Sequence, residues 1–203
     1  MKKILIAVMA VFMLAGCGNE KAQQLGEIEY TEEAFDTGAK EEMKPILPEE
    51  ECDFGNFQWG MALEDVANVH GSGYTKKEDG TIRYERVRIE GFASDAEYNF
   101  TDGRLSGATY FIMPDSEYGD KLQYLADYDS LKEKYTARFG APADEEIQFA
   151  AGMETENRGE QAQLLGEGNI LFRTVWKSPT TEIRVVMAQK DGICIGVKIS
   201  PIQ

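Results

Sequence analysis

Apolar and polar residues alternate along much of this chain, which is the pattern of strands that bury one face. Between residues 92 and 100 the apolar side chains share one face of an extended segment: Phe92, Ala96, Tyr98 and Phe100. Similar runs predict strands at residues 54–60, 82–89, 105–112, 170–177, 183–187 and 193–199, and residues 145–149 are a weaker candidate for a short strand. Asp-Gly pairs between such runs supply the positive φ angles of tight turns: Asp79-Gly80, Asp102-Gly103 and Asp191-Gly192.

Two other segments repeat their apolar residues at helical spacing. The first covers residues 61–70 and ends at Gly71; its apolar face carries Leu63, Val66, Ala67 and His70. The second ends at Gly140 and has the longest stripe in the chain: Tyr124, Tyr128, Leu131, Tyr135 and Phe139. Residues 143–169 contain many glycines and charges, and apart from the candidate strand at 145–149 we expect a mobile hairpin or loop there.

Together these patterns predict an α+β fold made of two halves, each a helix laid on an antiparallel meander. The simplest arrangement packs two helices on one face of a six- or seven-stranded antiparallel sheet, because such a sheet can leave its other face in water. We expect residues 52–203 to form this single globular domain, since a segment of about this length buries ample core.

The N-terminus has a different composition. Lys2 and Lys3 precede an uncharged apolar run, Ile4 to Leu14, which is too short to span a bilayer and is typical of a signal peptide. The run leads into Leu14-Ala15-Gly16-Cys17, which resembles the lipobox of bacterial lipoproteins. That resemblance implies removal of residues 1–16 and a diacylglyceryl group on the Cys17 sulfur. The alternative is an ordinary secretory signal with a chance cysteine.

Residues 17–51 are predicted to be the lipid anchor and an acidic, flexible tether. Their apolar residues are sparse and follow no sustained period, so they cannot bury enough surface to offset the entropy of ordering. The chain as a whole has a formal net charge of −15. Such a surface repels nucleic acid and anionic headgroups, and so we expect no nucleic-acid partner and a membrane contact made through acylated Cys17.

Little catalytic chemistry is apparent in the sequence. Cys52 and Cys194 remain after lipidation, and export would permit a disulfide between them; two unpaired thiols are the alternative. His70 is the one histidine and could in principle pair with either thiol, although a histidine at a helix end needs no such role. The sequence contains no metal-ligand spacing, phosphate loop or nucleophile motif, so we expect no catalytic residue, no metal and no cofactor.

Two short segments suggest relatives. Gly60-Met61 followed by Val66, and later the run Phe100-Thr101-Asp102-Gly103-Arg104-Leu105, resemble the BamE-type (SmpA/OmlA) domain of small bacterial lipoproteins. The two helix–meander halves also resemble β-lactamase-inhibitor-protein-like folds. The BamE-type resemblance implies a non-catalytic partner in outer-membrane assembly.

The sequence therefore predicts a membrane-anchored extracytoplasmic lipoprotein, on the cell membrane or outer membrane, that acts as a non-catalytic binding or envelope-assembly module with an unknown envelope protein. One alternative is a surface-displayed inhibitor or ligand-capture domain that uses the wet sheet face. A second alternative is a thiol-dependent enzyme that uses Cys194, Cys52 or His70. In a host with two membranes, Gly18 rather than Asp after the anchor favours outer-membrane sorting, as the lipoprotein resemblance implies.

Replacing Cys17 with Ser should release the processed protein from membranes, because the acyl chains are its expected anchor. Membrane fractionation of processed material checks this expectation. Processed Cys17→Ser protein that still sediments with membranes would show that the anchor is elsewhere.

Overall fold

The computed structural model of the chain describes residues 52–113 and 119–202. The predicted signal peptide (1–16), the lipidation site Cys17 and the tether (17–51) lie outside the described residues. Within the described part, the elements follow in the order α1 (Leu63–His70), β1 (Thr75–Lys76), β2 (Ile82–Ile89), β3 (Phe92–Thr101), β4 (Arg104–Ile112), α2 (Leu122–Phe139), β5 (Asp144–Phe149), α3 (Arg158–Glu167), β6 (Ile170–Lys177), β7 (Thr181–Gln189) and β8 (Ile193–Pro201).

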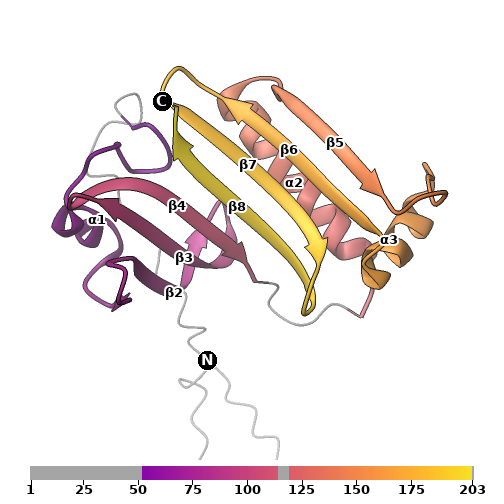
Figure 1. The fold of residues 1–203 in the computed structure, drawn as a ribbon, viewed down its shortest axis with the longest axis horizontal. Coiled ribbons are helices and arrows are strands. Elements are labelled where there is room, and N and C mark those ends of the chain that lie inside the picture. Colours follow the sequence, from indigo (N-terminus) through magenta and orange to yellow (C-terminus); the bar gives the residue numbers. More distant parts are fainter. Residues whose placement is uncertain (1–51, 114–118, 203) are drawn as a thin grey trace, which may run out of the picture. The chain divides into compact units, whose positions relative to one another are not determined.

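The strands of the described chain form one open antiparallel sheet of eight, in the order β1-β2-β3-β4-β8-β7-β6-β5 (Figure 1). Strands β1 to β4 run in sequence order from one edge of the sheet to its middle, and α1 precedes them in the chain. Strands β5 to β8 run in the same way from the other edge, and α2 precedes them, so each half is a four-stranded meander. The two meanders meet where β4 pairs with β8 and Tyr110 lies opposite Val197. The predicted α+β class and its antiparallel sheet are therefore confirmed, whereas the numbers of strands and helices differ from the prediction.

The sheet is larger than the six or seven strands that the sequence predicts, because the weaker candidate at 145–149 does form a strand, β5, and residues 75–76 form a short edge strand, β1. The predicted strand at 54–60 is wrong. Gly55 takes a φ of 50° and turns the segment back on itself, so that Phe54 and Phe57 form one isolated bridge. Both rings are buried, with centroids 5.4 Å apart, so these aromatic residues belong to the core without forming a strand of the sheet.

Both predicted helices are confirmed. Four residues of the predicted α2 stripe are buried, and so is one further leucine: Tyr124, Leu125, Tyr128, Leu131 and Tyr135. Phe139, the last residue of the predicted stripe, is only partly buried. Gly140 takes a φ of 81° directly after α2, where a residue with a Cβ would be strained. The start of α1 has Ala62 in place of a capping side chain, and Asp65 compensates by accepting a hydrogen bond from the Ala62 backbone N at 3.2 Å.

α1 and α2 pack on the same face of the sheet. The His70 ring at the end of α1 lies 5.0 Å from the Tyr84 ring of β2, and the Tyr128 ring of α2 lies 5.6 Å from the Phe172 ring of β6. One row of directly paired core residues crosses the sheet from β2 to β6: Tyr84, Ala96, Tyr110, Val197, Val185 and Thr174. Its last residue, Thr174, is two residues from Phe172 on the same strand. Side chains two residues apart on a strand share a face, and so one continuous core underlies both helices.

The predicted loop after β5 is wrong, since it contains a third helix, α3. The Asn157 side chain caps its start by accepting from the backbone N of Gly159 at 2.9 Å and of Glu160 at 3.2 Å. Gly168 ends it with a φ of 76°. α3 contacts α2, β6 and β7 and buries Leu165 completely. The described part of the chain therefore contains three helices and not the two that the sequence predicts.

The Tyr128 hydroxyl ties α2 to the sheet through a 2.7 Å hydrogen bond to the Thr174 hydroxyl, which is fully buried. Tyr128→Phe should lower the free energy of unfolding by about 1–3 kcal/mol, because it leaves that hydroxyl without a partner. Adding Thr174→Val should restore much of the loss. Urea denaturation of the two single variants and the double variant measures the coupling; additive losses would show that the hydrogen bond is not the cause.

Candidate functional site

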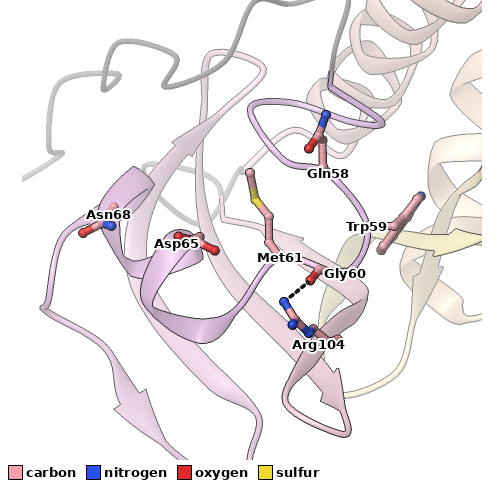
Figure 2. A pocket seen from close by; sticks show the side chains of 7 residues that line it. All are labelled: Gln58, Trp59, Gly60, Met61, Asp65, Asn68 and Arg104. Atoms are coloured by element: carbon pink, nitrogen blue, oxygen red, sulfur yellow. Dashed lines mark hydrogen bonds between the residues drawn. The ribbon is translucent and has the colours of Figure 1, made fainter.

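A pocket of about 350 Å³ opens beside the start of α1 (Figure 2). Residues from the 58–61 loop, from α1 and from the start of β4 line it: Gln58, Trp59, Gly60, Met61, Asp65, Asn68 and Arg104. These residues combine a carboxylate, a guanidinium and two amides with a thioether and an indole. They can hydrogen-bond a small polar ligand, but none of the seven side chains is a hydroxyl, a thiol or an imidazole.

The pocket forms where the two segments that carry the BamE-type resemblance meet. The backbone N of Gly60 donates to the Leu105 carbonyl at 3.0 Å, and the Leu105 N donates to the Met61 carbonyl at 2.8 Å. Arg104 Nη1 adds a 3.2 Å hydrogen bond to the Gly60 carbonyl, which Figure 2 shows as a dashed line. These bonds fasten the loop before α1 to β4, so the motif residues have a structural role whether or not the pocket binds anything.

A second candidate is the face of the sheet opposite α1 and α2, here called the open face. At its centre Gly196 of β8 lies between Phe111 of β4 and Val186 of β7, each directly opposite it in the ladder. Phe111 is 37% exposed, and Met113, two residues further on, is 42% exposed. Phe111 lies near the end of the inner strand β4 and Met113 directly follows that strand, and neighbouring exposed apolar side chains of this kind are typical of an interaction surface.

Gly196 is the least expected residue of this face. It lies within a long central strand, where glycine costs roughly 0.5–1 kcal/mol relative to alanine. Its φ is not positive, so the backbone does not require glycine. A Cβ built on it would have no heavy atom within 4 Å, so the packing does not require glycine either. Glycine in such a position often marks the close approach of a ligand or of another backbone.

Ion pairs surround this apolar centre. On the β2–β3 side, Arg83 Nη2 lies 2.5 Å from Asp95 Oδ2. On the β5–β6 side, Arg173 Nη2 lies 2.7 Å from Asp144 Oδ2 and 2.6 Å from Glu146 Oε2. Hydrogen bonds from Gln148 and then Arg173 hold the pKa of Glu146 below its usual value. An apolar centre with an arginine-rich polar rim has the composition of a protein–protein interface.

The structure separates the two cysteines, and neither is in a disulfide. The Thr181 hydroxyl donates to the carbonyl of Asp53 at 3.3 Å, which places Cys52 near the Thr181–Pro201 pair at one end of β8. Cys194 lies seven residues from Pro201, about 23 Å along the strand. A disulfide needs Cα atoms about 4.4–6.8 Å apart, so the bridge that export would permit does not fit this fold.

His70 and Cys194 lie on opposite faces of the sheet, so they cannot form a thiol–imidazole pair. His70 Nε2 lies 2.5 Å from the Tyr98 hydroxyl on the helix-covered face, among aromatic rings. Cys194 is exposed on the open face, as its position between Ile193 and Ile195 predicts. The sheet beneath removes water from around the thiol and raises the pKa of Cys194, which opposes formation of a thiolate.

Over residues 52–113 and 119–202, no group of three or more His, Cys, Asp or Glu side chains is arranged to hold a metal ion. In the same residues, no helix is both long enough and apolar enough to cross a bilayer. No family model, curated protein or solved structure matches this chain.

Sequence reasoning did not identify Gly196 and Phe111 as site residues. A signal was present, because Gly196 occupies a wet position in the alternating strand 193–199, where the neighbouring wet positions hold Cys194 and Lys198. Its place beside Phe111 could not be predicted, since that depends on the pairing of β4 with β8 across about 85 residues of chain.

With Cys17 and Cys52 both changed to Ser, Cys194 is the one thiol of the chain, and iodoacetamide should alkylate it slowly at pH 7. A raised thiol pKa leaves less thiolate at neutral pH than an ordinary cysteine has, so the rate should keep rising at pH values where an ordinary thiol is already fully ionised. The pH profile of alkylation checks this. A rate at pH 7 above that of free cysteine would instead support the thiol-enzyme hypothesis.

Proposed function

We propose that this protein is a lipid-anchored, non-catalytic binding module of the bacterial cell envelope that holds a protein partner on the open face of its sheet. The lipobox-like sequence ending at Cys17 supports the anchor, and the acidic stretch of residues 17–51 supports a spacer between membrane and domain. The proposal joins the binding-module hypothesis with the wet sheet face that the ligand-capture hypothesis invokes.

One observation carries the proposed docking face: Gly196 stands in the central strand of the described sheet with no steric or conformational need for glycine. Because glycine costs stability there, the fold alone gives no reason for it. A partner chain that approaches the backbone between Phe111 and Val186 does give a reason. Phe111 supplies the exposed aromatic surface that often anchors such contacts.

A binding role also fits the position of the reactive side chains. Catalysis by a thiol needs a base beside it, and the imidazole of His70 lies under the helices while Cys194 faces solvent on the other side of the sheet. The pocket beside α1 is compatible with a small polar ligand. It is the weaker candidate, because the Arg104–Gly60 hydrogen bond already serves the fold.

Gly196→Thr should abolish partner binding while leaving the free energy of unfolding unchanged or up to about 1 kcal/mol higher, since threonine favours strands. Binding can be followed with the photo-crosslinking residue p-benzoylphenylalanine in place of Phe111, in cells of the native host. A discrete adduct should form and should disappear when Gly196→Thr is added.

Two controls make this result specific. The same photo-crosslinking residue in place of Glu133, which is exposed on α2, should give no such adduct. Lys76→Thr places the same new side chain on the edge strand β1, on the helix-covered face, and should leave the adduct intact. An adduct that survives Gly196→Thr, or that forms equally from position 133, would contradict the proposed docking face.

A further inference from the structure

Two cations face each other at the centre of the open face. Lys198 of β8 and Arg184 of β7 are directly opposite in the antiparallel ladder, and Lys198 is exposed. Like charges in this relation destabilise a sheet. The pairing is unexpected in a chain with 36 acidic residues against 21 lysines and arginines, where a carboxylate opposite either residue would be favourable.

Local carboxylates do not neutralise the pair. Arg184 Nη2 binds Glu182 Oε1 at 2.9 Å, but Lys177 Nζ lies 3.4 Å from the other oxygen of the same carboxylate. Among the described residues Lys198 has no ion pair, and the buried Nε of Arg184 has no acceptor. Two cations therefore share the Glu182 carboxylate while Lys198 has none in the described part of the chain, and this part of the face carries surplus positive charge.

The cation pair adjoins the apolar centre at a defined spacing. Gly196 and Lys198 are two residues apart on the same strand and face, which separates them by about 6.6 Å. Alternate side chains of an extended segment have the same spacing. One extended chain lying over β8 can therefore place one side chain above Gly196 and another beside Lys198.

We infer that the partner docks an extended acidic segment here, with a carboxylate between Lys198 and Arg184 and, two residues away, an apolar side chain over Gly196 against Phe111 and Val186. This inference rests on the proposed docking face and adds the chemical class of its occupant. A shared carboxylate relieves the repulsion between the two cations and forms charge-assisted hydrogen bonds with both.

The net charge of −15 does not forbid an acidic occupant. At an ionic strength of 0.15 M the Debye length is about 8 Å, so distant acidic residues are screened while cations in direct contact are not. Local geometry therefore outweighs the total charge. The association should weaken as salt is raised further, because the contact depends on exposed cations.

The test uses the mature chain with Cys17→Ser, labelled with ¹⁵N, and titrates it with acetyl-Thr-Glu-Thr-Val-Thr-Glu-Thr-Val-Thr-amide. Amide shifts should map to Gly196, Lys198 and Phe111. The matched peptide with Gln in place of Glu should bind about tenfold more weakly, the effect of losing a charge-assisted hydrogen bond. Lys198→Glu should lower the affinity for the acidic peptide by at least about tenfold, because it removes the charge-assisted hydrogen bond and adds repulsion between two carboxylates. Lys134→Glu makes the same charge change on α2 and should have no effect.

Each remaining outcome overturns the inference. If both peptides bind the open face equally, the docking face stands and the acidic occupant is wrong. If no open-face amide shifts, the inference fails, whereas the proposed function is judged by the photo-crosslinking experiment. If the peptide binds only after Glu49, Glu50 and Glu51 are all changed to Gln, the occupant is the acidic stretch of this chain and not a partner.

Discussion

The antiparallel pairing of β4 with β8 is the interaction on which the rest of this fold depends. Each half alone would be a four-stranded meander with an exposed edge at its last strand, and unpaired edges invite aggregation. Joining the last strands hides both edges and merges two apolar faces into one row that runs from Tyr84 to Thr174. The remaining edges are β1, with two residues, and β5, which begins with three consecutive acids; both are poor templates for further pairing.

Local physics explains which parts of the fold could be predicted. The α2 stripe and the alternation in β3 depend only on neighbours in sequence, and both are confirmed. The helix α3 was not predicted because its apolar residues are few and follow no clear stripe. Asn157 and Gly168 are nevertheless good local signals for its two ends. In β2 a bulge between Tyr84 and Val87, with Arg86 at a φ of 52°, shifts the faces and explains why alternation is poor there.

The candidate site was less predictable than the fold, because it is assembled from strands that are distant in sequence. Phe111, Val186 and Gly196 come from three strands, and only the strand order makes them neighbours. Conversely, composition alone suggests a disulfide between Cys52 and Cys194, but they lie toward opposite ends of β8 and are too far apart to form one. Sequence identifies the residue types, whereas the register decides which of them can act together.

The open face contains residues that the fold does not explain, whereas the fold explains the residues of the pocket, and so the open face is the stronger candidate site. Gly107 of β4 is also a strand glycine, but a Cβ there would lie 3.3 Å from Asn99 Nδ2, so packing accounts for it. In the pocket, the Arg104–Gly60 hydrogen bond fastens a loop. Gly196 and the Lys198–Arg184 pair lie two residues apart, each costs stability, and neither has a structural reason. Since most sequence choices in a folded domain agree with its stability, two adjacent departures on one exposed face are best explained by what that face binds.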